Sequence, residues 1–274
     1  MATISVVAAF PSCKKDNTSS GTADELETTF ELSGDQAISD NLNSDAEYVL
    51  DEAAADKGFS GETAVGITTT MNVLSCATVS VTPLIGFPKT ISIDFGAGCT
   101  STNGVTRSGK INVTLSDSLR KSGSIAVMTF DNYYVSGFKK EGIITWTNTS
   151  QGGTKSWMRK CEDGKVTAPN GHYWLHSGSQ QVVQTAGAST AHDLIDDVFL
   201  ITGSHTVTNA AGKTRTSEIT EPLEKKVLCD NIDMGKIKIQ GPNHFAILDF
   251  GNGFCDRIAT ISIDGSTPKT ILLR

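Results

Sequence analysis

One acidic cluster in this sequence has the side-chain types that acid–base catalysis requires. Asp193, Asp196 and Asp197 follow closely after His192. Two carboxylates whose pKa values are pushed apart are the arrangement that glycosidases use. The cluster is expected where a loop meets a strand, however, and Asp at such junctions commonly caps the backbone or stays solvated. We therefore predict that the protein is not an enzyme, and we retain a hydrolase with this acidic site as an alternative.

Metal binding is the second chemistry that the residue types allow. Cys161, His172 and His176 lie within 16 residues of one another, and the two histidines would share one face of a strand. No fourth ligand is evident, and the residues between the histidines are typical of an ordinary strand. Calcium could instead bind the acidic cluster or Asp249 and Asp256, but the sequence has no EF-hand loop. We predict no metal and no cofactor.

Four aromatic residues have the type needed for stacking on sugar rings: Trp146, Trp157, Tyr173 and Trp174. On the outside of a sheet they would bind a glycan, whereas facing inward they would only build the core. The chain also lacks the G-x-S-x-G, H-E-x-x-H and P-loop motifs. The sequence therefore favours a non-enzymatic structural, adhesive or accessory binding module. A carbohydrate-binding accessory protein of a surface glycan-uptake system is the first alternative.

The elements that must position these residues are mostly strands. From residue 64 onward polar and apolar residues alternate with a period of two, which indicates strands with one buried and one wet face. Clear examples are residues 78–82, 90–94, 110–115, 235–239 and 259–263. Turn signals such as Asn-Gly and Asp-Gly separate the strands and leave no room for helical crossovers. The sequence predicts a mainly β protein, an antiparallel meander or sandwich-like sheet, over residues 59–274.

One amphipathic helix is predicted ahead of the sheet, over residues 35–58. Five apolar or small residues recur at helical spacing on one face: Ile38, Leu42, Ala46, Val49 and Ala53. The opposite face is acidic, and we expect the apolar face to pack on the sheet. Residues 13–34 are rich in Ser, Thr, Gly, Asp and Glu, so we predict that they form an acidic flexible tether.

The charge of the chain is concentrated in this N-terminal segment. The net charge of the 274 residues is -7, and residues 1–60 alone carry 12 acidic and 3 basic side chains. The remainder of the chain is close to neutral, which gives no basic surface for a phosphate backbone and excludes a nucleic-acid partner. No apolar run approaches the ~18–20 residues of a membrane-spanning helix.

A weak internal two-fold repeat runs through the predicted sheet. Asp94-Phe95-Gly96-Ala97-Gly98-Cys99 is similar to Asp249-Phe250-Gly251-Asn252-Gly253-Phe254-Cys255. A further cysteine precedes each copy, Cys76 in the first and Cys229 in the second. The repeat predicts two possible halves, residues 59–150 and 151–274, built on a similar plan of strand, turn and strand.

Two features of the sequence resemble known bacterial lipoproteins. Phe10-Pro11-Ser12-Cys13 looks like a lipobox after a short apolar stretch, and Lys14-Lys15-Asp16 resembles the start of surface lipoproteins of Bacteroidota. The lipobox departs from the usual pattern at Phe10 and Pro11. The Asp-Phe-Gly-x-Gly-(x)-Cys segments are similar to those of a group of uncharacterised Bacteroidota lipoproteins.

This resemblance implies where the protein is located rather than what chemistry it performs. Residues 1–12 would be part of a lipoprotein signal peptide, and Cys13 would carry the lipid that anchors the protein. We therefore expect an exported, lipid-anchored protein of the outer membrane or cell surface. The membrane is its expected partner, and a glycan or protein partner stays open.

Export would also decide the state of the cysteines, because disulfides persist in oxidising compartments. Four cysteines allow three pairings, and the repeat favours the two local ones, Cys76 with Cys99 and Cys229 with Cys255. A zinc ribbon would need the close C-x-x-C spacing, which these cysteines lack. Cys161 is left without a predicted partner.

Overall fold

The computed structural model describes residues 22–60, 73–102, 104–190, 194–229 and 231–273. One long helix, α1 (Ala23–Asp56), precedes an antiparallel meander that includes a single turn of 3₁₀ helix, η1 (Leu194–Asp196). The strands are β1 (Thr78–Thr82), β2 (Lys89–Asp94), β3 (Cys99–Thr100), β4 (Thr106–Leu115), β5 (Ile125–Val135), β6 (Phe138–Asn148), β7 (Ser156–Thr167), β8 (Tyr173–Ala186), β9 (Val198–Asn209), β10 (Thr214–Lys226), β11 (Met234–Gln240), β12 (Phe245–Asn252), β13 (Ile258–Ile263) and β14 (Lys269–Leu272). The predicted fold class, a mainly antiparallel β meander after one helix, is confirmed.

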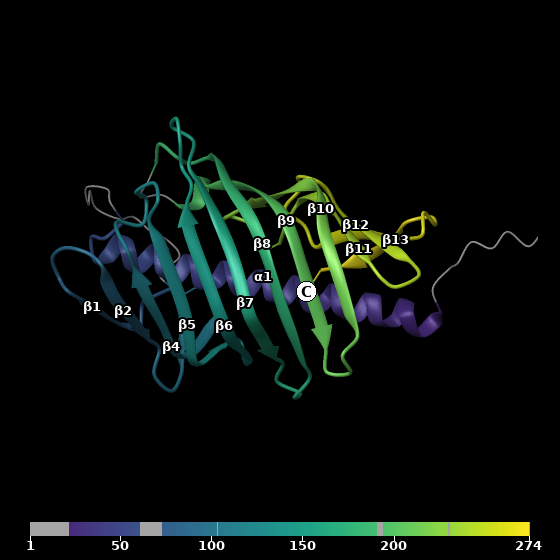
Figure 1. Cartoon of the computed structure of the whole chain (residues 1–274), viewed down its shortest axis with the longest axis horizontal. Coiled ribbons are helices and arrows are strands. Elements are labelled where there is room, and N and C mark those ends of the chain that lie inside the picture. The colour runs from purple at the N-terminus through teal and green to yellow at the C-terminus, as the bar shows by residue number, and fades with distance from the viewer. Residues whose placement is uncertain (1–21, 61–72, 103, 191–193, 230, 274) are drawn as a thin grey trace, which may run out of the picture.

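The strands form one sheet in which neighbours along the chain pair antiparallel (Figure 1). The order runs from β1 and β2 through β4 to β14 without a crossover, and β3 pairs with β4 beside this path. β6 pairs with β7 across the boundary predicted between residues 150 and 151, so the sheet is continuous there. β1 and β14 are the outer strands of this order.

The two copies of the Asp-Phe-Gly repeat fold into the same turn. The Asp94 carboxylate accepts a hydrogen bond from the amide of Gly96 at 2.8 Å, and Asp249 accepts one from the amide of Gly251 at 2.9 Å. The phenylalanine between them is buried in both copies. An Asp side chain that binds the backbone two residues on is a common turn-forming device. The repeat seen in the sequence is therefore also a structural repeat.

Helix α1 begins at Ala23, well before the predicted start at residue 35. Thr22 and Glu25 form a capping box, in which each backbone amide donates to the other residue's side chain at 2.8 and 3.3 Å. Residues 23–34 are thus helical, and the predicted tether over 13–34 is wrong in this part. Their polar composition is typical of a tether, but the sheet supplies buried partners, as where Arg215 donates to the Thr29 hydroxyl at 2.7 Å.

The predicted apolar face of α1 packs on the sheet, which curves along the helix (Figure 1). Leu42, Ala46, Val49 and Ala53 are buried, and Ile38 packs against the same core while partly exposed. Among the described residues, no helix combines the length and the apolar composition needed to cross a membrane.

Polar side chains of α1 are buried as well, because the strands offer them hydrogen-bond partners. Lys140 of β6 donates to the amide oxygen of Asn43 at 2.6 Å, and the indole of Trp174 on β8 donates to the Ser39 hydroxyl at 2.8 Å. All four side chains are buried. A buried polar group needs such a partner, since an unpaired one costs about 1–3 kcal/mol. The helix is therefore held in a defined register along the sheet.

Candidate functional site

A large cavity lies between the N-terminal half of α1 and strands β9–β14. Its volume is about 550 Å³, which is within the ~300–1,000 Å³ typical of ligand pockets. Branched aliphatic side chains form most of the wall on the sheet side: Ile201, Leu223, Ile237, Ile239, Leu248 and Ile261. We take this cavity as the candidate functional site.

Strand alternation and small helix residues together create the cavity. On β11, Ile237 and Ile239 face α1, while the lysines that alternate with them do not line the cavity. The side of α1 that faces these strands includes Ala37 and Ser44, whose side chains are short, and Gly34, which has none, so space is left between the helix and the sheet. The cavity is thus a consequence of which residues the two elements place opposite each other.

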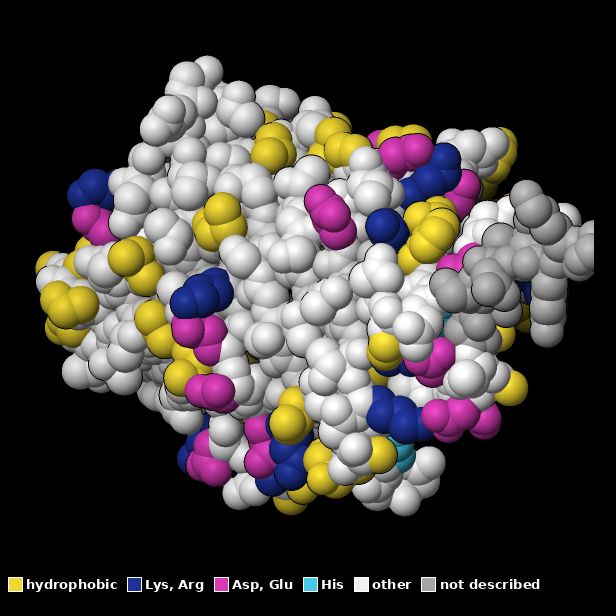
Figure 2. All heavy atoms as spheres, turned by 45° about the vertical axis from the view of Figure 1, so that its right-hand side comes forward, with side chains coloured by type: hydrophobic (Ala, Val, Ile, Leu, Met, Phe, Trp, Pro, Cys, Tyr) yellow, Lys and Arg dark blue, Asp and Glu magenta, His cyan; other side chains and the backbone are white. Residues whose placement is uncertain are grey.

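The mouth of the cavity lies between α1 and the outer strand β14. Of the apolar lining residues, Phe30 on α1 is 44% exposed and Leu272 on β14 is 72% exposed. β14 pairs with β13 and is the last strand of the described order, so no further described strand covers this side. Figure 2 brings this end of the molecule forward and shows hydrophobic side chains scattered among charged ones of both signs.

A polar patch around Asp40 and Arg159 lies on the wall of the cavity. Arg159 of β7 donates to the side chain of Gln180 and lies over the ring of Trp146, 5.4 Å from its centroid. The Asp40 carboxylate is 3.8 Å from the guanidinium of Arg159 and 3.4 Å from Nδ1 of His205. Burial alone would raise the pKa of Asp40, but His205 and Arg159 outweigh it and hold the pKa below its ordinary value. The charges of this patch are therefore matched within the protein.

A row of buried titratable side chains continues from Asp40 into the sheet. Nε2 of His205 is 3.3 Å from Nδ1 of His176, which is 3.6 Å from Sγ of Cys161. Burial raises the pKa of Cys161 and lowers the pKa of His176, so the thiol and the imidazole are both neutral. Because the thiolate is the reactive form of cysteine, this row favours a structural role over nucleophilic catalysis.

The predicted metal ligands Cys161, His172 and His176 do not come together. His176 lies beside Cys161, but His172, just before β8, contacts α1, 3.1 Å from the Asp35 carboxylate and 3.8 Å from Glu31. Glu31, Asp35 and His172 are close enough to share a metal ion, although a hydrogen bond between His172 and Asp35 already engages two of these groups. Local sequence patterns could not predict this group, because Asp35 and His172 are 137 residues apart.

The structure joins the four paired cysteines as the repeat predicted. Cys76 is bonded to Cys99 and Cys229 to Cys255, with Cα–Cα distances of 5.7 and 5.2 Å. Cys161 is free and buried. The predicted lipidation site, Cys13, lies outside the described residues.

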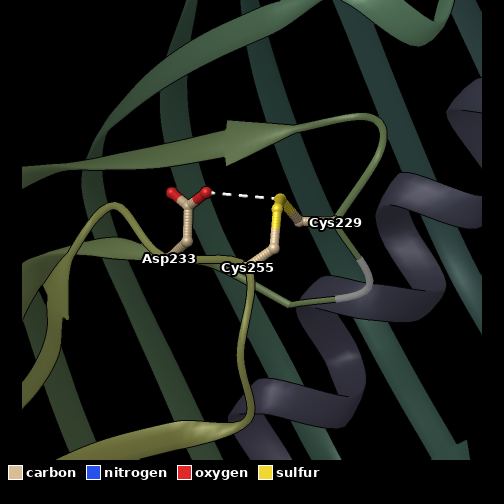
Figure 3. A group of neighbouring side chains, drawn as sticks. All are labelled: Cys229, Asp233 and Cys255. Carbon is tan, nitrogen blue, oxygen red and sulfur yellow. Dashed lines mark hydrogen bonds between the residues drawn. A yellow bond between two sulfur atoms is a disulfide. The ribbon is translucent and has the colours of Figure 1, made fainter.

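The second disulfide accounts for another group with metal-ligand character. Cys229, Asp233 and Cys255 lie close together, with Oδ2 of Asp233 3.4 Å from Sγ of Cys229 (Figure 3). Both sulfur atoms are committed to the disulfide, and Asp233 forms an ion pair with Lys226 at 2.9 Å. The group is therefore a structural junction between the end of β10 and the β12–β13 connection.

The predicted acidic cluster is divided in the structure. His192 and Asp193 lie outside the described residues. Asp196 is exposed and accepts a hydrogen bond from a nearby threonine hydroxyl at 2.6 Å. Asp197 is buried and accepts one from Gln184 at 2.7 Å. The two described carboxylates thus have different partners and different solvent contact.

Asp197 belongs instead to an acidic group that only the fold assembles. It lines a small pocket with Glu47 and Asp51 of α1, beside Arg120. Burial, together with the charge of Asp51, raises the pKa of Glu47 to about 8; burial raises the pKa of Asp51 to about 6 and that of Asp197 to about 7. The pocket measures about 30 Å³, which is room for about one or two water molecules and not for a substrate.

This group makes stability dependent on pH. The pKa of Glu47 is raised from 4.5 to about 8 on folding, so the folded chain holds a proton that the unfolded chain has lost, and stability falls as the pH rises through about 8. We expect Glu47→Gln to stabilise the protein on the order of 1–2 kcal/mol near pH 9 and little near pH 5, because Glu47 keeps some solvent contact. Urea denaturation at the two pH values measures this. Exposed Glu162→Gln is the control, and an equal effect of Glu47→Gln at both pH values contradicts the assignment.

Asp249 and Asp256, the other carboxylates considered for calcium, each stabilise a local turn. The carboxylates of Asp249 and Asp256 each accept a backbone amide two residues on, at 2.9 and 2.8 Å, in separate turns. This arrangement does not support the calcium alternative, since a calcium ion needs six to eight converging oxygen ligands.

The four predicted stacking residues do not share an exposed surface. Trp146 and Trp174 are buried, Trp157 is partly buried against Phe199, and Tyr173 is 37% exposed. Tyr173 and Trp174 are consecutive on β8 and so point to opposite faces of the sheet. The predicted platform for sugar rings is therefore not formed by this set.

No protein-family model, curated protein sequence or solved structure matches this chain.

Proposed function

We propose that this protein is a non-enzymatic binding module that holds an apolar ligand between α1 and strands β9–β14. The observation that carries the proposal is the cavity of about 550 Å³ with its aliphatic wall and its mouth beside β14. Removing apolar surface from water favours binding by about 25 cal/mol per Å². An unfilled aliphatic cavity in a well-packed protein is therefore a favourable place for an apolar molecule.

The chemistry around the cavity supports binding rather than catalysis. Asp40 and Arg159 on its wall are engaged with each other and with neighbouring side chains. The nearby Cys161 is a buried, protonated thiol, because burial raises its pKa. The groups described at the cavity thus offer a ligand mainly apolar contact, which is how most ligand pockets are lined.

An apolar dye tests this function. N-phenyl-1-naphthylamine, which is neutral and fluoresces in apolar sites, should bind the full chain in about one equivalent. Ile261→Trp should weaken binding at least tenfold, since Ile261 is 2% exposed and lines the cavity. Ile258→Trp on the same strand is the matched control, because Ile258 is 50% exposed and lies on the outer face. Equal binding by both variants, or none by the wild type, would contradict the proposal.

We further propose that the module is anchored to the cell envelope through a lipid on Cys13. The lipobox-like sequence supports this location, and two disulfides are typical of an oxidising compartment. A lipid at Cys13 would place the ligand cavity close to a membrane, since only the nine residues 14–22 lie between Cys13 and the start of α1 at Ala23.

Replacing the anchoring cysteine tests the location. In cells that process bacterial lipoproteins, Cys13→Ala should move the protein from the membrane fraction to the soluble fraction, because the thiol that accepts the lipid is lost. Cys161→Ala, which removes a buried free thiol, should leave fractionation unchanged. Membrane association of Cys13→Ala equal to that of the wild type would refute lipidation.

A further inference from the structure

We infer that the ligand of this cavity is a single-chain acyl amphiphile, with its chain inside the cavity and its polar head in water at the mouth. The inference rests on the proposed binding function and assigns the chemical class of the ligand. Three features of the site carry it: the character of the wall, the position of the mouth and the state of the inner polar patch.

The wall is suited to a flexible hydrocarbon chain. Most of its sheet side is formed by Ile and Leu from five consecutive strands, β9 to β13, with Phe250 among them and Lys225 of β10 as a charged exception. Ile38 of α1 lines the opposite side. Branched aliphatic side chains provide many weak dispersion contacts without a preferred ring orientation, whereas recognition of sugars or flat ring systems uses aromatic faces. The lining therefore favours an extended aliphatic chain.

The mouth allows such a chain to enter from the side. Phe30 and Leu272 flank it, and both large hydrophobic side chains are exposed to solvent. Apolar residues at an opening shield the first methylene groups of a chain while leaving a polar head hydrated. Glu31, next to Phe30, also lines the cavity and is itself exposed. The mouth therefore provides an apolar passage next to a hydrated rim.

The inner polar patch does not offer a site for a charged head. The Asp40 carboxylate has cationic or imidazole groups at 3.4 and 3.8 Å, and Arg159 also donates to Gln180. A carboxylate or ammonium head placed there would lose its hydration and break these contacts, which is costly for a buried charge. The head is better placed at the mouth, so binding should depend on chain length much more than on head charge.

Displacement of the bound dye from the full, disulfide-bonded chain tests the inference. The probes are saturated fatty acids from octanoic to stearic acid, used below their micellar concentrations, and alkylamines and alcohols with the same chains. We expect affinity to rise about fourfold per added methylene until the cavity is full, as ~0.8 kcal/mol per buried methylene requires. Exchanging the head group at constant chain length should change affinity by less than about tenfold.

Two variants test whether the acyl chain of the ligand lies inside the cavity. Ile261→Trp should abolish displacement by the longer acids and should move the limit of the length series to shorter chains, because the indole takes up part of the cavity. Ile258→Trp should reproduce the wild-type series. Circular dichroism and thermal unfolding of both variants show that the fold is retained. Where Ile261→Trp does not fold, Ile239→Phe, a smaller change on the same wall, replaces it.

The outcomes separate this inference from the proposed function. If the dye binds but no member of the three series displaces it, or if affinity is independent of chain length, the acyl-chain inference is overturned while the binding function stands. If the dye itself does not bind, the function fails. Preference for the acid over the amine by a factor of a hundred or more that disappears in Arg159→Gln would place the head at the inner patch and overturn its position at the mouth.

Discussion

Replacing Arg107 with Met should lower the free energy of unfolding by about 3–5 kcal/mol, which is the usual cost of leaving a buried charge without its partner. The Arg107 side chain on β4 is 1% exposed and pairs with Asp45 of α1, with Nε donating at 3.0 Å. Nη1 donates to the Ser101 hydroxyl at 2.9 Å, and the Tyr133 hydroxyl donates to Asp45 at 3.2 Å. The substitution would therefore leave the Asp45 carboxylate between the helix and the sheet without its cation.

A neighbouring ion pair on the same strand supplies the control. Lys110 pairs with Asp94 at 2.9 Å, but its side chain is 45% exposed, so Lys110→Met should lower the free energy of unfolding far less than Arg107→Met does. Urea denaturation of both variants measures the difference. The double variant Arg107→Met/Asp45→Leu should regain part of the loss, because neither charge then remains unpaired. A cost for Arg107→Met as small as that for Lys110→Met would show that α1 is not held by this contact.

Removing either disulfide should cost about 3 kcal/mol, as expected for loops of this length in the chain-entropy account. The paired cysteines are 23 positions apart for Cys76 and Cys99 and 26 apart for Cys229 and Cys255. Without the disulfide the unfolded chain gains conformational entropy, whereas the folded hairpins keep their backbone hydrogen bonds. The loss of stability therefore comes mainly from the unfolded state. Urea denaturation of Cys76→Ala/Cys99→Ala and Cys229→Ala/Cys255→Ala, with and without a reductant, measures the loss.

The reductant provides an internal check on this result. It should destabilise the wild type by more than either double variant, since each variant has one bond fewer to lose. Cys161→Ala should have an effect that does not depend on the reductant, because that thiol is free and buried. Free thiols at Cys76, Cys99, Cys229 or Cys255 in the non-reduced, purified protein would contradict the pairing.

The fold class could be predicted because its determinants are local. Residues two apart along a strand share a face, so alternation in the sequence gives the faces of β2, β4, β11 and β13 directly. Short turns then force neighbouring strands to pair antiparallel. The Asp-Phe-Gly repeat is local in the same sense, because each Asp binds an amide only two residues away.

The N-terminal segment could not be predicted from its own composition. Its acidic and hydroxyl side chains are typical of a solvated tether, and the acidic face of the helix is typical of a surface helix. Asp45 nevertheless pairs with a residue 62 positions away, and Thr29 with one 186 positions away. These partners come from strands that lie next to α1 only in the folded sheet.

By itself the sequence determined the strands, the turns, the repeat and the two local cysteine pairs, because each depends on neighbours a few positions to a few tens of positions away. Tertiary structure alone decided that the polar helix is buried, which acids lie beside Asp197, and that Cys161 and His172 are far from sharing a site. It also decided the cavity, which exists because small residues of α1 lie opposite aliphatic residues of β9–β14. The volume left between two elements depends on the side chains of both, so no pattern within either segment of the sequence predicts it.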